Sequence, residues 1–183
     1  LTLPDNRKEV LRLLEPFKVF FEDPGIEKIG HNLKYDFKVL RNYGITVKAP
    51  FFDTMVAHYL INPDMRHNMN ILSETYLNYS PQPITDLIGK KGKSQSSMRE
   101  VPLEKQTEYA VEDADITLQL KQFFEKEMIA ANTLALYKTV ELPLVEVLTD
   151  MECEGINLDI EFLNELSNGL TSDIEVLEKV IFH

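Results

Sequence analysis

The sequence has little cysteine and no long apolar run. Its one cysteine, Cys153, excludes an internal disulfide and a cysteine-based zinc site, and this usage favours a reducing cytoplasm. No stretch approaches the roughly 18 uninterrupted apolar residues of a membrane span, and the N-terminus has no signal-peptide pattern. It also begins with Leu1 rather than Met. We therefore expect a cytoplasmic protein without a membrane partner, cut from a longer chain.

The net charge of -11 is unevenly distributed. Residues 141–183 hold eleven acidic residues and one basic residue, Lys179, which together account for -10. The first 140 residues are nearly neutral, with 18 basic and 19 acidic side chains. The acidity of the whole chain therefore does not exclude a nucleic-acid substrate.

What is present is a globular composition, with 44% hydrophobic and 27% charged residues in 183 positions. This length suffices for one domain with a core, or for one domain and the start of another. Apolar spacing predicts helices at 7–22, 33–43, 54–61, 69–79, 103–129 and again from 130 to 148, with extended segments at 26–30 and 45–52.

Residues 80–102 differ in composition from their surroundings. They are rich in Pro, Gly and Ser, and they contain four basic residues against two acids. We expect a mobile, locally basic loop, and the sequence leaves open whether it is a solvated linker or faces DNA.

Two places combine acids with partners that a core does not need. Gly30-His-Asn-Leu-Lys-Tyr-Asp36 runs from a strand end into a helix and places Asp36 in the first turn, where it would also favour the helix dipole. In Tyr109-Ala-Val-Glu-Asp113, the spacing of four puts phenol and carboxylate on one helix face. Each alone is more simply an exposed helix residue; together they favour a catalytic site.

The chemistry that fits these residues is phosphodiester hydrolysis by two divalent ions. Carboxylate oxygens suit Mg²⁺ or Mn²⁺, and such a site needs about four carboxylates around the two metals and a phosphate. A neighbouring tyrosine can orient the attacking water. The four histidines, at positions 31, 58, 67 and 183, are scattered along the sequence and predict no histidine-rich metal site.

At this point the residues resemble a known family, the 3′→5′ proofreading exonuclease domain of bacterial, family A DNA polymerase I. Gly30 to Leu40 is similar to its second exonuclease motif, and Tyr109 to Leu118 to its third. Further segments with a similar counterpart in the same order are Phe52-Asp-Thr-Met55, Arg66-His-Asn-Met69, Gly92-Lys-Ser-Gln95, Glu141 to Leu148 and Glu154 to Asp159. The last two look like the junction that leads into the polymerase thumb.

The resemblance implies separate roles for the site residues. Asp113 would be a direct metal ligand, Asp36 would serve the second metal, and Tyr109 would orient the attacking water. Asn32, Tyr35 and Arg66 would contact the 3′-terminal nucleotides of a single DNA strand. The rest of the polymerase chain would be a further partner.

The family's first motif, an Asp-x-Glu pair on an opening strand, has no counterpart before residue 7. The Asp-x-Glu triplets of this sequence, including those at 159–161 and 173–175, all lie beyond the third motif in helical surroundings. We therefore expect an α/β chain with an incomplete RNase H-like fold, mostly helical, with about two short strands. Residues 1–138 would form the exonuclease domain and 139–183 the junction and the first part of the thumb. We also expect weak or absent metal binding, no useful hydrolysis by this chain alone, and an uncovered apolar face that favours self-association.

Three other interpretations stay open. The chain could be a structural exonuclease-like domain of a polymerase that has lost proofreading, although Asp36, Tyr109 and Asp113 are all retained. A ribonuclease D-like RNA exonuclease would share the nuclease motifs but would leave the acidic, polymerase-like tail unexplained. A helical binding module without chemistry would tolerate alanine at Asp36 and Asp113.

Overall fold

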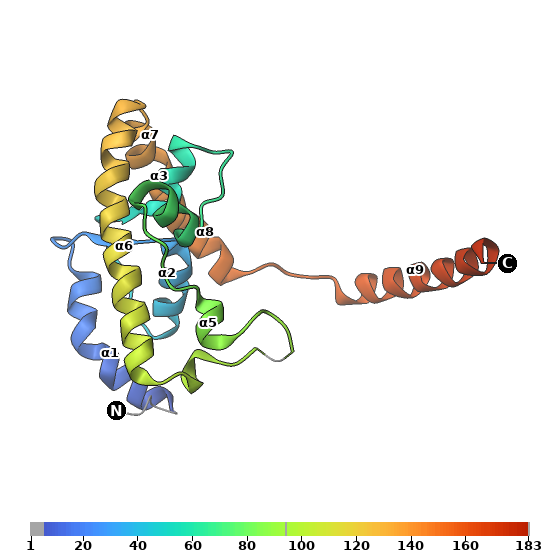
Figure 1. Ribbon diagram of the computed structural model, residues 1–183. Coiled ribbons are helices and arrows are strands. Elements are labelled where there is room, and N and C mark those ends of the chain that lie inside the picture. Colours follow the sequence, from blue (N-terminus) through green and yellow to red (C-terminus); the bar gives the residue numbers. More distant parts are fainter. Residues whose placement is uncertain (1–5, 94, 183) are drawn as a thin grey trace. The chain divides into compact units, whose positions relative to one another are not determined.

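The computed structural model describes residues 6–93 and 95–182, which divide into two compact units, Leu1–Asp150 and Met151–His183 (Figure 1). Within these described ranges, no helix is long and apolar enough to cross a membrane. The first unit carries all the site residues predicted from the sequence. Its first half contains α1 (Arg7–Glu22), β1 (Lys28–Gly30), α2 (Leu33–Asn42), β2 (Phe51–Asp53), α3 (Thr54–Ile61), α4 (Met69–Leu72) and the π-helix η1 (Ser73–Leu77).

The later elements are mostly helical as well. They are α5 (Ile84–Ile88), the 3₁₀-helix η2 (Met98–Glu100), α6 (Leu103–Ala130), α7 (Leu134–Leu136), the π-helix η3 (Tyr137–Glu141), α8 (Leu142–Glu154) and α9 (Ile160–Ile181). The expected mostly helical α/β fold with two short strands is thus confirmed. The two strands are parallel, and their register pairs Gly30 with Asp53.

The end of β1 requires glycine because the chain folds back on itself there. A Cβ atom at Gly30 would lie 2.2 Å from a methyl carbon of Leu33, which is far inside any real carbon contact. The close approach lets β1 turn directly into α2. Asn32, at this turn, has the left-handed conformation, with φ of 66°.

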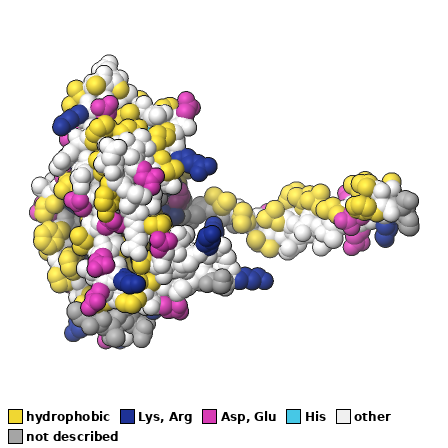
Figure 2. Space-filling model, viewed as in Figure 1, with side chains coloured by type: hydrophobic (Ala, Val, Ile, Leu, Met, Phe, Trp, Pro, Cys, Tyr) yellow, Lys and Arg dark blue, Asp and Glu magenta, His cyan; other side chains and the backbone are white. Residues whose placement is uncertain are grey.

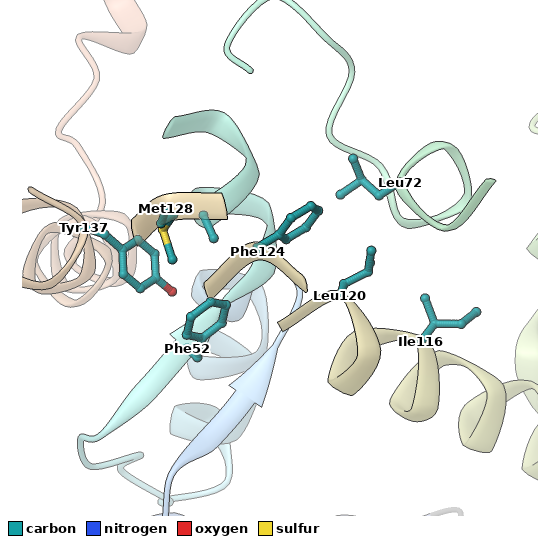
Figure 3. Packing of buried hydrophobic residues seen from close by; sticks show 8 residues of the cluster. Phe52, Leu72, Ile116, Leu120, Phe124, Met128 and Tyr137 are labelled. Atoms are coloured by element: carbon teal, nitrogen blue, oxygen red, sulfur yellow. The ribbon is translucent and has the colours of Figure 1, made fainter. Parts of the chain in front are cut away.

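The main core forms around α6. Ile116, Leu120, Phe124 and Met128 recur every four residues, so they share one helix face, and all are buried. Figure 3 shows this face with Phe52 from β2, Leu72 from α4 and Tyr137 from η3 beside it. The long helix therefore anchors the sheet, and the position of Asp113 one turn earlier is fixed by the same packing.

A smaller core cluster lies between α2 and β2. Leu33 and Phe37 of α2 pack with Val47, Phe51 and Val145, and the Phe37 and Phe51 rings meet edge to face at 5.1 Å. Because Val145 belongs to α8, the compact unit continues beyond residue 138 to Asp150. The boundary at 138/139 stays a prediction.

Asp53 joins the two helices that follow the strands. Its carboxylate is 1% exposed and accepts backbone N–H groups from both α2 and α3. The donors are Asn32 (3.2 Å), Leu33 (2.7 Å), Met55 (2.9 Å) and Val56 (3.2 Å). One side chain thus caps two helix N-termini and holds the strand ends to them.

Two expectations about the middle of the chain were wrong in detail. Residues 80–102, expected to be a mobile, locally basic loop, contain α5 and the 3₁₀-helix η2, which begins after the Ser97 cap. The helix expected at 69–79 ends at Leu77, because its last turn is a π-helix and Asn78 turns into the left-handed conformation. Ser94 of the segment similar to the family lies outside the described residues.

The second unit is dominated by α9, which begins after Asp159 accepts the N–H of Phe162 (2.9 Å). None of its described residues is buried within the chain, and Figure 2 shows hydrophobic side chains along it. Exposed apolar residues also occur on α1, where Phe17 and Phe20 are more than half exposed. The predicted self-association stays a prediction.

Candidate active site

Asp36 and Asp113 line the same cavity, although they are far apart in the sequence. The cavity has a volume of about 480 Å³, and its other walls include Gly30, His31 and Met69. Asp36 comes from the first turn of α2 and Asp113 from the middle of α6. The structure therefore brings together the two acids that the sequence singled out, beside the end of β1.

The two carboxylates share an unfavourable electrostatic setting. Loss of hydration raises the pKa of Asp36, and the nearby charge of Asp53 raises it further. Loss of hydration also raises the pKa of Asp113, against a hydrogen bond from Tyr109 that lowers it. Acids whose charge is disfavoured in this way gain from a cation placed between them.

Tyr109 lies one turn before Asp113 on α6, as the spacing predicted. Partial burial, the charge of Asp113 and the interaction of the hydroxyl with that carboxylate raise the pKa of Tyr109. The phenol therefore stays protonated at neutral pH and points its donor toward the carboxylate.

The residues predicted to contact nucleic acid surround the cavity without lining it. Asn32 lies in the turn before α2, and Tyr35, next to Asp36, is 65% exposed. Arg66 is exposed in the connection between α3 and α4, three residues before the cavity-lining Met69. Tyr35 and Arg66 are therefore exposed, and each is close in sequence to a residue that lines the cavity.

Two of the histidines that are scattered along the sequence, His58 and His67, meet in the fold. Their Nδ1 atoms are 2.7 Å apart, and Nε2 of His58 is 2.9 Å from the Tyr76 hydroxyl. His31 lines the cavity and has Nδ1 2.9 Å from Thr54 Oγ1. His183 lies outside the described residues. No spacing rule in the sequence connects residues 58, 67 and 76, so only the fold could reveal this cluster.

Glu112, which precedes Asp113 on α6, has a different role. Glu112 accepts the Tyr79 hydroxyl and the Gln82 N–H (3.0 Å), and it lines a separate cavity of about 680 Å³ with Tyr79 and Asp115. It ties the segment after η1 to α6. Neighbouring acids on one helix thus serve structure (Glu112) and the candidate site (Asp113).

The sequence was compared with known proteins. A DNA polymerase I from Rhizobium leguminosarum is 36% identical over 181 residues, which are 98% of this chain and 18% of that protein. A DNA polymerase I from Chloroflexus aurantiacus is 41% identical over 175 residues, covering 95% of this chain and again 18% of that protein. The chain thus spans less than a fifth of the length of these relatives.

Solved structures show the same fold. The chain matches a structure described as the POL domain of Pol1 from M. smegmatis with a TM-score of 0.71 and 22% identity, over 91% of this chain and 26% of that one. It matches Brucella melitensis NrnC with a TM-score of 0.62 and 23% identity, over 74% of this chain and 63% of that one. The model of the 3′-5′ exonuclease family matches residues 2–129, which contain every candidate site residue named above. The chain therefore belongs to the 3′-5′ exonuclease family found in DNA polymerase I.

Proposed function

We propose that this chain is the proofreading part of a DNA polymerase I, which removes 3′-terminal nucleotides from a single-stranded DNA end. One observation carries the proposal: Asp36 and Asp113, from two helices, line one cavity, and Tyr109 lies one turn before Asp113 on the same helix. A core does not need this arrangement, because it leaves two partly desolvated carboxylates at one cavity.

Asp36 and Asp113 would hold a divalent cation, Mg²⁺ or Mn²⁺. Their oxygen atoms are the donors that such ions prefer, and a cation would relieve the poor solvation of both carboxylates. Brucella melitensis NrnC, which shares the fold with a TM-score of 0.56 in this form, has a structure with bound Mg²⁺. In family members two such ions supply charge neutralisation for the attacking and leaving oxygens.

The fit to two ions is partial. Among residues 6–93 and 95–182, no three His, Cys, Asp or Glu side chains are grouped to hold a metal. Two carboxylates do not neutralise two divalent ions, so we propose that the 183-residue chain binds metal weakly and hydrolyses DNA poorly alone. Two further carboxylates, arranged as Asp-x-Glu on an adjoining strand, would complete the site.

The chain's own residues would bind and orient the substrate. The Tyr109 hydroxyl, kept protonated by its raised pKa, would position a water against Asp113. Arg66 would attract a phosphate by its charge, Tyr35 would pack against a nucleotide, and Asn32 would donate hydrogen bonds from its amide.

Residues 139–183 would form the junction and the start of the polymerase thumb, with the rest of the polymerase as the intramolecular partner. A cytoplasmic location would follow from that assignment. Exposed apolar side chains on α1 and α9 would be covered by the adjoining polymerase and would favour self-association of the separate chain.

The test compares matched acids on one helix in the polymerase that contains this chain. Asp113→Ala is expected to reduce Mg²⁺-dependent removal of 3′ nucleotides from labelled single-stranded DNA by about 100-fold or more. Asp115→Ala is the control, since Asp115 is exposed on α6, accepts a hydrogen bond from the Gln119 amide (2.6 Å) and does not line the cavity. Equal activity of both variants would overturn the proposal.

A second measurement addresses the partial site. The separate 183-residue chain is expected to show no Mg²⁺-dependent trimming above background under the same conditions. Trimming that Asp113→Ala abolishes would contradict the need for further carboxylates, while leaving the exonuclease assignment intact.

A further inference from the structure

The connection between α3 and α4, residues 62–68, is held to the core by a chain of three polar side chains. His67 Nδ1 meets His58 Nδ1 at 2.7 Å, and His58 Nε2 meets the Tyr76 hydroxyl at 2.9 Å. His58 is fully buried, with its ring 5.4 Å from that of Phe124 on α6. The partner that His67 contacts is therefore a fixed part of the core.

The same connection reaches the candidate active site. Arg66 immediately precedes His67 and is exposed, while Met69, two residues after His67, lines the cavity with Asp36 and Asp113. His67 also interacts with His31, another wall of that cavity. His67 thus lies between an exposed arginine, Arg66, and a residue that lines the candidate site, Met69.

Residues 62–66 have one apolar anchor, Met65, which packs against the main core and whose Sδ lies 3.9 Å from the Tyr76 hydroxyl. Asn62 N–H donates to the His58 carbonyl (2.9 Å), and Met65 N–H donates to that of Asn62 at a longer 3.3 Å. Three of the five are polar or charged and exposed: Asn62, Asp64 and Arg66. The core contact of Met65 and the side-chain bond of His67 therefore hold the segment on either side of Arg66.

We propose that His67, held by His58 and Tyr76, is a positioning residue that fixes Arg66 for contact with the phosphates of the 3′ strand. The proposal rests on the proposed function. A preordered arginine binds a phosphate more tightly than a mobile one because less conformational freedom is lost on binding. The mechanism predicts that His67 contributes to DNA affinity only while Arg66 is present.

At least one of the two facing imidazoles must be neutral for this contact to be a hydrogen bond. Two facing Nδ1 atoms form a hydrogen bond when one carries a proton and the other offers its lone pair. Burial, together with the neighbouring His67 and His31, lowers the pKa of His58 to about 4. The chain Tyr76–His58–His67 is therefore intact at neutral pH.

The experiment is a double-mutant cycle on the 183-residue chain, which retains both residues and needs no hydrolysis. Binding of a fluorescent single-stranded oligonucleotide is measured by anisotropy at low salt for wild type, Arg66→Ala, His67→Ala and the double variant. We expect Arg66→Ala to weaken binding about 10-fold and His67→Ala about 5-fold. The double variant should bind within about twofold of Arg66→Ala alone.

A conservative variant separates positioning from folding. Asparagine places a side-chain amide near the position of Nδ1, so His67→Asn can keep the bond to His58 and should retain affinity within about twofold of wild type. If His67→Ala does not fold, His67→Asn and Tyr76→Phe, which removes the far end of the chain, provide the comparison. The affinity for the oligonucleotide is expected to decrease in the order wild type, His67→Asn, Tyr76→Phe.

The inference is overturned if the Arg66 and His67 effects multiply in the double variant, or if His67→Ala binds as wild type does. It is also overturned if Arg66→Ala has no effect. None of these results touches the loss of activity expected for Asp113→Ala, so the proposed function and this inference can fail separately.

Discussion

Asp53 and the cavity acids, Asp36 and Asp113, are the same residue type in opposite surroundings. Asp53 is buried and accepts four backbone N–H groups from two helix starts. The cavity acids are more exposed, yet loss of hydration raises the pKa of each. A carboxylate whose hydrogen bonds are all supplied by the protein stabilises the fold. Carboxylates with few protein donors are instead suited to bind a cation.

The same contrast extends to the neighbours of each acid. Tyr137 is buried next to Asp53, where its hydroxyl accepts the Asp53 N–H (2.7 Å) and donates to the Asp53 carbonyl (3.1 Å). Tyr109 is half-buried, and its pKa is raised by partial burial and by the charge of Asp113, one turn later on the same helix. Tyr137 thus completes hydrogen bonds within the core, whereas the Tyr109 hydroxyl lies beside the acid of the cavity.

The strongest test of the comparison removes the buried acid. Asp53→Ala leaves four N–H groups without their acceptor and uncaps α2 and α3, so we expect a loss of about 3–5 kcal/mol in the free energy of unfolding. Urea unfolding followed by circular dichroism measures it. Asp64→Ala, at an exposed acid of the same unit, is the control and should stay within about 0.5 kcal/mol of wild type. A loss below about 1 kcal/mol for Asp53→Ala would contradict the capping role.

A second test uses pH on the buried histidine. The pKa of His58 is about 4 in the folded chain against 6.5 for the free side chain, so only the unfolded chain takes up a proton between these values. Stability is fully present above pH 6.5 and falls as the pH drops toward 4, by up to about 3 kcal/mol from this residue. Urea unfolding at pH 7, 5.5 and 4.5 should show a smaller decrease for His58→Gln than for wild type. Parallel pH profiles would refute the assignment to His58.

A third test removes only the hydroxyl that serves Asp53. Tyr137→Phe leaves the Asp53 N–H without its acceptor in the core, and we expect a loss of about 1–2 kcal/mol. Tyr109→Phe is the matched control, because its hydroxyl reaches a partly solvated carboxylate, and it should change the unfolding free energy by less than about 0.5 kcal/mol. Thermal unfolding at pH 7 compares the two; equal losses would break the distinction between the tyrosines.

The sequence predicted the parts of the fold that depend on local patterns. The period of Ile116, Leu120 and Phe124 indicated the helix of α6, and the predicted strand ends at 26–30 and 45–52 contain β1 and lead into β2. The same local spacing placed Tyr109 and Asp113 on one helix face. That Asp36 lies near them followed from a resemblance, and the structure places it at the same cavity.

Contacts between distant segments could not be read from local patterns. The Asp53 carboxylate accepts hydrogen bonds from the N–H groups of Asn32 and Leu33, about twenty residues earlier. The sequence around Asp53 does not predict these bonds. The pairing of His58 with His67 spans the connection after α3, where periodicity gives no information. The composition of residues 80–102, rich in glycine and lysine, gave no indication of their two short helices. One of these helices, η2, is capped by Ser97, which accepts the N–H of Arg99 (3.3 Å).

The smallest expected effect has the opposite sign from that at Asp53. Asp113→Asn removes a charge that loss of hydration disfavours, so the variant should be more stable than wild type at pH 7, by about 0.5 kcal/mol after allowance for solvent screening. Because the pKa of Asp113 is raised in the folded chain, wild type regains this energy as the pH falls through that value. The difference between the two proteins should therefore shrink toward pH 4, as measured by thermal unfolding without divalent ions. A variant less stable than wild type at pH 7 would place Asp113 with Asp53, among the acids that serve the fold.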